Sequence, residues 1–170
     1  MKQMYYHLSF DDDLEGEWKP RTPVGFDMVK DAKGYGPNMT EPRTPRICLS
    51  PSLTGCFAAI YPNIYSLFEV KKYPHSLHYV YGAEIDDQDP LFNESSQLTK
   101  DRVIWDAHLT QEVWYRGKLN MRLLQRIKCT PNLKKSIYTH PFNDPDEARC
   151  YHSPEIEIQV VKRYPSFYKR

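Results

Sequence analysis

Short windows of alternating apolar and polar residues give the first picture of this chain. Residues 4–10 (MYYHLSF) are aromatic and apolar without a breaker, and they predict a first strand. Alternation puts two sets of side chains on opposite faces of that strand: Tyr5, His7 and Ser9 against Tyr6, Leu8 and Phe10. We therefore expect the apolar face to pack and the other face to stay available.

The residues after position 45 predict a strand followed by a helix. Residues 46–49 (RICL) are typical of a buried strand, and Ser50-Pro51 then supplies a serine N-cap with proline in the first turn. Apolar residues at 53, 56, 57 and 60 have the i, i+3, i+4, i+7 spacing of one buried helix face, and Pro62 ends the pattern.

The remaining segments predict further strands and much loop. Residues 11–45 contain three consecutive aspartates and two copies of Pro-Arg-Thr-Pro, which present Arg21 and Arg43 on extended backbone. Further strands are expected at 76–85, 103–109, 111–117, 121–129 and 156–164, and those between 103 and 129 are expected to form a meander. This order of strands, with one good helix, indicates the α+β class.

Composition favours one loop-rich domain and excludes several classes of partner. A chain of 170 residues with fourteen prolines predicts a single domain, residues 1–170, with short elements. Its 23 basic and 22 acidic residues create no global field toward nucleic acid or a membrane, and the basic, aromatic C-terminal end is interpreted as a solvated tail. Four cysteines without a C-x-x-C pair indicate free thiols in a reducing cytoplasm and no metal site. The first nine residues predict neither a signal peptide nor a membrane anchor.

Three segments recur in an order that is similar to a known family. They are Tyr6-His7-Leu8-Ser9, Arg46-Ile47-Cys48-Leu49-Ser50, and Thr110-Gln111-Glu112-Val113-Trp114-Tyr115. Together they resemble the His-Tyr-Glu clade of ADP-ribosyltransferases, which includes the diphtheria-toxin-like and poly(ADP-ribose) polymerase catalytic domains. The resemblance implies two small, twisted, mainly antiparallel sheets that form a cleft, with few helices, and with His7 and Glu112 facing one cavity.

The resemblance also implies NAD as a substrate and a role for each matching residue. Glu112 is the catalytic candidate, because a carboxylate stabilises the positive charge that develops on the nicotinamide ribose. The implied NAD-binding residues are His7 on the adenosine ribose, Ser9 on the nicotinamide amide, Phe57 or Tyr61 stacked on the nicotinamide ring, one of Arg21, Arg43 and Arg46 on the pyrophosphate, and Ser50 at the end of the second motif. The acceptor is a macromolecule, protein in preference to nucleic acid, in a cytoplasm that is the host's if a phage encodes the chain.

Two departures from the clade keep other functions open. The framework tyrosine falls on Cys48, or its role has moved to Tyr61, and Thr110 differs from the acidic or amide residue of arginine-modifying relatives. A catalytically inactive nucleotide-binding or inhibitor protein is therefore the alternative, and a tRNA 2'-phosphotransferase-like activity is disfavoured by the near-neutral charge. A structural alternative treats His7 as a packed histidine and Glu112 as a strand carboxylate paired with Arg116 or Arg122.

Overall fold

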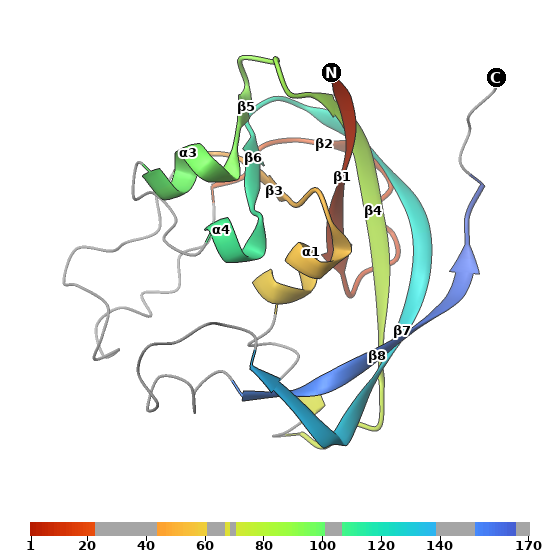
Figure 1. Ribbon diagram of the computed structural model, residues 1–170. Helices are drawn as coiled ribbons and strands as arrows, with labels where there is room; N and C mark the ends of the chain where they lie inside the picture. Colours follow the sequence, from red (N-terminus) through yellow and green to blue (C-terminus); the bar gives the residue numbers. More distant parts are fainter. Residues whose placement is uncertain (23–43, 61–66, 69–70, 101–106, 139–151, 166–170) are drawn as a thin grey trace.

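The computed structural model describes residues 1–22, 44–60, 67–68, 71–100, 107–138 and 152–165 (Figure 1). Its strands are β1 (Lys2–Ser9), β2 (Gly16–Trp18), β3 (Ile47–Leu49), β4 (Ser76–Asp86), β5 (Phe92–Asn93), β6 (Val113–Tyr115), β7 (Leu119–Tyr138) and β8 (His152–Arg163). Its helices are short: α1 (Leu53–Ala59), α3 (Ser95–Lys100) and α4 (Ala107–Thr110). The predicted α+β class is confirmed.

Two antiparallel sheets contain all of these strands. The larger has the order β1-β4-β7-β2, with β8 also paired to β7, and the smaller has the order β3-β6-β5. Helices α1, α3 and α4 lie on the same side of the long strands β1, β4 and β7 (Figure 1). The prediction of two antiparallel sheets with few helices is confirmed, whereas a ligand cleft between them stays a prediction.

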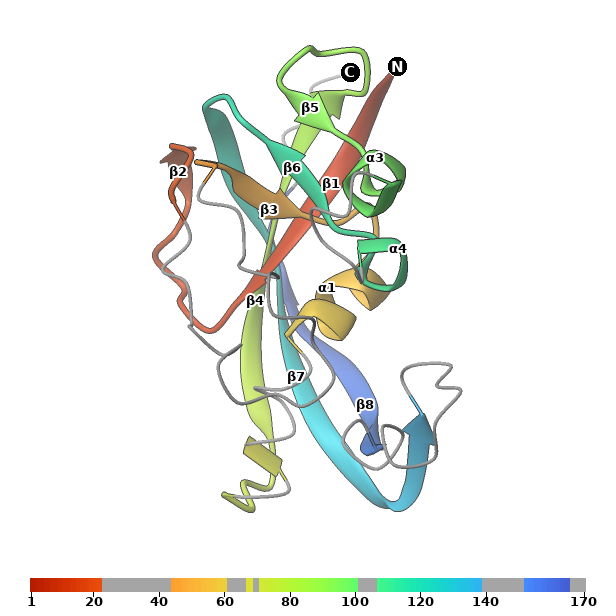
Figure 2. The same cartoon turned by 90° about the vertical axis from the view of Figure 1, so that its left-hand side faces the viewer.

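Two isolated bridges join the sheets into a ring of neighbouring strands. Tyr6 and Ser50 exchange backbone hydrogen bonds of 2.8 and 2.9 Å, which link β1 to the end of β3. Arg21 and Arg46 exchange bonds of 3.0 and 3.1 Å, which link the chain after β2 to the start of β3. Strand pairing therefore runs from β1 to β4, β7 and β2, and the two bridges close the ring from β2 through β3 back to β1. Figure 2 shows β3 beside β1.

Three clusters of buried side chains hold the sheets and helices together. The main core is assembled from five strands of the ring and the smaller sheet: Tyr5, Ile47, Leu49, Tyr81, Ala83, Ile85, Val113, Tyr115, Leu119 and Met121. The second cluster packs α1 on β1, β4 and β7: Leu8, Cys56, Phe68, Val80, Ile127 and Cys129. The third packs α3 and α4 on β6: Leu98, Ala107 and Trp114. Strand β1 is thus packed on both faces, and the expectation of one available face was wrong.

The predicted helix after β3 is present, but its cap lies two residues later than expected. Ser52 is the N-cap, and its hydroxyl accepts a 3.0 Å hydrogen bond from the Gly55 amide. Ser50 is buried instead, where its hydroxyl lies 3.3 Å from the Thr110 carbonyl oxygen and donates to it. A Cβ on Gly55 would lie 2.2 Å from Ser50 Oγ and 2.3 Å from Thr110 O, so this glycine lets α1 approach the end of α4 closely.

Three strand predictions are corrected by the structure. Strand β2 lies in the segment that was expected to be loop. The prediction missed it because three residues are too few to show a periodic pattern. Residues 107–109 are helical in α4, where the prediction was a strand; residues 101–106 lie outside the described residues. Strands β6 and β7 belong to different sheets and form no meander, because alternation fixes a strand's faces without fixing its partner.

Candidate functional site

Glu112 lies at a sharp change of backbone direction between α4 and β6. The helix ends at Thr110, the strand begins at Val113, and Gln111 between them has φ 54°. Non-glycine residues adopt this left-handed conformation rarely, at a cost of about 1–3 kcal/mol, so the surrounding contacts must hold it. The Glu112 amide donates to the Ala107 carbonyl at 3.2 Å, and the Ser52 hydroxyl at the cap of α1 donates to the Gln111 side chain.

The Glu112 side chain is held by a tryptophan of the strand that it precedes. Trp114 Nε1 donates a 2.7 Å hydrogen bond to Glu112 Oε1. The carboxylate is half-buried, whereas the indole is buried against α3 and α4. Residues two apart in an extended segment share a face, which explains the contact. The predicted alternative partners do not take this role: Arg116 bonds the Pro90 carbonyl, and Arg122 is exposed on β7.

A buried arginine lies over the ring of the same tryptophan. Cys48 is opposite Trp114 in the β3–β6 pairing, so alternation places Arg46 and Cys48 on the same face as Glu112 and Trp114. The Arg46 guanidinium carbon lies 3.9 Å from the centroid of the Trp114 ring, a cation–π contact. Arg46 is only 3% exposed. Arg46, one of the three arginines expected at the pyrophosphate, is therefore buried in the fold.

The Cys48 thiol lies between these charged groups and stays protonated. Burial, and then the charge of Glu112, raise the pKa of Cys48 to about 12, and the positive charge of Arg46 opposes them. A thiol with this pKa is not a nucleophile at neutral pH. The position at which the clade has a tyrosine thus carries a small, neutral side chain beside the Glu112 carboxylate and the Arg46 guanidinium.

His7 contacts the backbone of Cys48. Its Nδ1 lies 3.2 Å from the Cys48 carbonyl oxygen, and its ring packs edge-on against Trp18 with centroids 4.9 Å apart. Burial lowers the pKa of His7, although the bond to the carbonyl opposes this, so the imidazole is neutral at pH 7 and donates from Nδ1. Trp18 packs on the main core, whereas Trp114 belongs to the third cluster. His7 thus meets Cys48 at its carbonyl oxygen and Glu112 lies beside its thiol, and the expectation that the two residues face one cavity stays a prediction.

The other predicted site residues have structural contacts or lie elsewhere. The Ser9 hydroxyl accepts from the Asp11 amide at 3.1 Å, as in a turn at the end of β1. Phe57 packs in the second cluster, with its ring edge-on to that of His78. Arg21 is exposed, and its backbone is held next to that of Arg46. Arg43 and Tyr61 lie outside the described residues.

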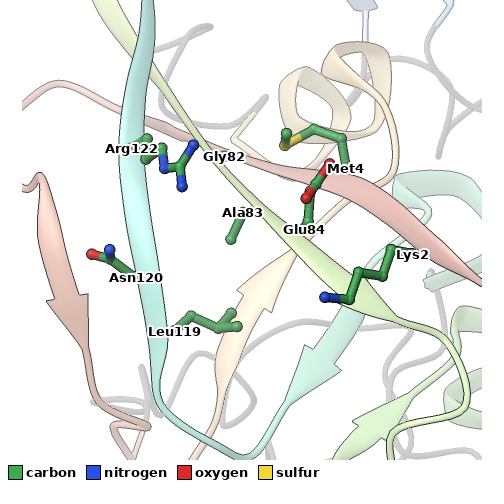
Figure 3. A pocket seen from close by; sticks show the side chains of 8 residues that line it. All are labelled: Lys2, Met4, Gly82, Ala83, Glu84, Leu119, Asn120 and Arg122. Carbon is green, nitrogen blue, oxygen red and sulfur yellow. The ribbon is translucent and has the colours of Figure 1, made fainter. Parts of the chain in front are cut away.

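Glu112 is not among the residues that line a hollow of about 220 Å³ on the larger sheet (Figure 3). Residues of β1, β4 and β7 line it: Lys2, Met4, Gly82, Ala83, Glu84, Leu119, Asn120 and Arg122. None of them is a predicted site residue. Ligand pockets for drug-sized molecules have volumes of about 300–1,000 Å³, so this hollow is too small to enclose a dinucleotide.

Some of the residues that form this arrangement were not predicted. The partnership of Glu112 with Trp114 could have been inferred from their spacing of two, whereas the strained conformation of Gln111 has no local signal.

Within the described part of the chain, no three His, Cys, Asp or Glu side chains gather as metal ligands would. The helices that the structure describes are also too short and polar to cross a membrane.

Comparisons of the chain with protein-family models, with curated proteins and with solved structures found no match.

Proposed function

We propose that this protein transfers ADP-ribose from NAD to a macromolecular acceptor, with Glu112 as the catalytic carboxylate. The geometry of Glu112 carries the proposal. Its carboxylate is partly open to solvent and held by the Trp114 indole at 2.7 Å, and it directly follows a residue with φ 54°. Strained backbone and a preoriented acid are features that active sites share.

The proposed chemistry needs a fixed negative charge. NAD supplies the bond between nicotinamide and ribose; nicotinamide leaves with the bonding electrons, and a nucleophile of the acceptor forms the new bond to the same ribose carbon. Positive charge develops on the sugar between these events, as in glycoside cleavage. A carboxylate that is already oriented by Trp114 stabilises this charge without reorganising during the reaction.

The three positions that correspond to the clade's signature residues, His7, Cys48 and Glu112, also lie on or beside neighbouring strands. Strand β3 is linked to β1 by the Tyr6–Ser50 bridge and to β6 by the Leu49–Val113 pair. The carbonyl oxygen of Cys48 consequently contacts the His7 ring, and the thiol of Cys48 lies beside Glu112. This adjacency joins segments that are far apart in sequence, and it supports the proposal independently of the motif order.

The contacts change which residues we assign to NAD. Arg46 stacks on Trp114 and is buried, so the exposed Arg21 beside it is the better candidate for the pyrophosphate. His7 and Phe57 are packed in aromatic contacts, and the proposal gives them no contact with NAD. The proposal thus rests on Glu112 for the chemistry and on Arg21 for binding.

The second candidate function is nucleotide binding or inhibition without turnover. The position of Cys48 favours it, because a protonated thiol cannot stack on a nicotinamide ring as an aromatic side chain can. In this case the same charged residues bind the nucleotide, and no ADP-ribose is transferred.

One assay separates the two candidates. The protein is incubated with cell lysate and NAD that carries a radioactive adenylate phosphate, and both transferred label and free nicotinamide are measured. Label on a macromolecule, absent with the Glu112→Gln variant, supports the transferase. Binding of NAD without transferred label or nicotinamide contradicts the transferase and favours the inactive binding protein.

A further inference from the structure

Strand β8 carries apolar side chains beyond the region that the helices cover. Ile127 and Cys129 of β7 are 0% exposed, but their register partners on β8, Val160 and Ile158, are 39% and 49% exposed. Val161 is also 49% exposed. The apolar surface that is buried on β7 therefore continues into solvent on β8.

The outer edge of β8 has no strand partner within the described part of the chain. Its inner edge pairs with β7, and residues 157–163 are all exposed. In Figure 1, β8 forms the outer margin of the larger sheet. An open edge presents a row of backbone N–H and C=O groups that can pair with another strand.

Charge is divided along this edge in a self-complementary way. Glu157 lies at one end of residues 157–163, Lys162 and Arg163 lie at the other, and the residues between them are uncharged. An antiparallel copy of the same strand sets each acidic end near the basic end of the other copy. A parallel copy would instead bring like charges together, which destabilises cross-strand pairing.

We propose that two copies of this chain pair edge to edge through β8, antiparallel, to form one continuous sheet. A two-fold axis at Gln159 places Ile158 opposite the second copy's Val160, so these apolar side chains meet at the centre. The same register places Glu155 opposite the second copy's Arg163 and Glu157 diagonal to it, so opposite charges meet at the ends. Such an isologous interface is self-complementary, as closed dimers require. It is also small, so the dimer forms reversibly. The inference is independent of the proposed activity.

Charge reversal tests both the surface and the orientation. Glu157→Lys makes the charges of residues 157–163 all positive, and the double change Lys162→Glu with Arg163→Glu makes them all negative. All three side chains are exposed, and Lys162 also lies over the Tyr164 ring at 4.6 Å, so each variant should fold and melt close to the temperature of the parent. Lys118→Glu, at a side chain 61% exposed on the turn before β7, is the control.

Sedimentation velocity in the absence of NAD measures the association. The parent and the control should dimerise, each edge variant should dimerise about tenfold more weakly, and an equal mixture of the two edge variants should regain the affinity of the parent. A parent that is monomeric up to about 300 µM overturns the proposal, since a dissociation constant above that range is no specific dimer. A dimer that the edge variants leave unchanged uses another surface and overturns it equally.

Discussion

The indole Nε1 of Trp114 donates a 2.7 Å hydrogen bond to Oε1 of Glu112, and this bond orients the only carboxylate to which we assign chemistry. Glutamine at position 112 keeps an oxygen that accepts the same bond. The substitution therefore removes the negative charge with little change in the contact, which makes it a sharp test.

Glu112→Gln should fold, bind NAD with nearly unchanged affinity and lose the chemical step. Removing one well-placed electrostatic group costs about 100- to 1,000-fold in rate. Single-turnover transfer of labelled ADP-ribose measures the effect, and the control is Glu17→Gln, which breaks an exposed ion pair with Lys118 at 3.2 Å. Near-normal transfer by Glu112→Gln, with only a small loss of stability, identifies Glu112 as a structural residue.

Arg46 and Arg21 should respond differently to alanine. Arg46 is buried over the Trp114 ring, so Arg46→Ala should lower the free energy of unfolding by about 2 kcal/mol, measured by urea denaturation. Arg21 is exposed, so Arg21→Ala should change stability by less than about 0.5 kcal/mol while weakening NAD binding by about tenfold. Unchanged NAD affinity in Arg21→Ala removes the pyrophosphate assignment.

Gly55→Ala should destabilise the protein although alanine is the better helix former. The new Cβ would lie 2.3 Å from the Thr110 carbonyl oxygen, which is backbone and cannot rotate away. We expect a net loss of about 1–3 kcal/mol in the free energy of unfolding. Thr54→Ala, at an exposed position in the same helix, is the control and should be nearly neutral. A Gly55→Ala variant as stable as the parent contradicts the close approach of α1 to α4.

His78 should make the protein less stable in mild acid. Its side chain is fully buried, with Nε2 2.8 Å from the Ser76 hydroxyl, and burial lowers its pKa from 6.5 to about 4. The unfolded chain takes up a proton near pH 6.5 and the folded protein only near pH 4. The free energy of unfolding therefore falls as the pH is lowered between these values, and the group contributes nothing to pH dependence above them.

The size of this effect can be isolated with His78→Phe, because the imidazole already packs against the rings of Phe10 and Phe57. Between pH 7 and pH 4.5 the parent should lose about 2 kcal/mol more than the variant, measured by urea denaturation at each pH. Equal losses in the two proteins show that His78 titrates normally.

Cys48 should resist alkylation in the folded protein. A thiol with a pKa of about 12 has almost no thiolate at pH 8, so iodoacetamide should modify Cys48 far more slowly than it does in urea. Peptide mass mapping after timed labelling gives the rates. Fast modification of Cys48 in the folded state, with the circular dichroism spectrum unchanged, contradicts the protonated thiol.

The sequence alone determined the features that depend on neighbouring residues. Periodicity located β1, β3, β4, β7 and β8 and the helix after β3, because strand alternation and helix spacing are local patterns. It also placed Glu112 at the entry to an apolar strand. Its contact with Trp114 follows from the same alternation, although it was not predicted.

Only the tertiary structure decided which segments meet. The Tyr6–Ser50 and Arg21–Arg46 bridges join residues that are distant in sequence, and no local pattern specifies them. The same pairings bring His7 to the Cys48 carbonyl group and bury Arg46 over the Trp114 ring, and both contacts join residues that are far apart in the sequence. Ser52 caps α1, whereas the hydroxyl of Ser50 donates a hydrogen bond to the Thr110 carbonyl group, which is distant in the sequence. Burial and strand partnership depend on contacts across the whole chain, so local propensity could not supply them.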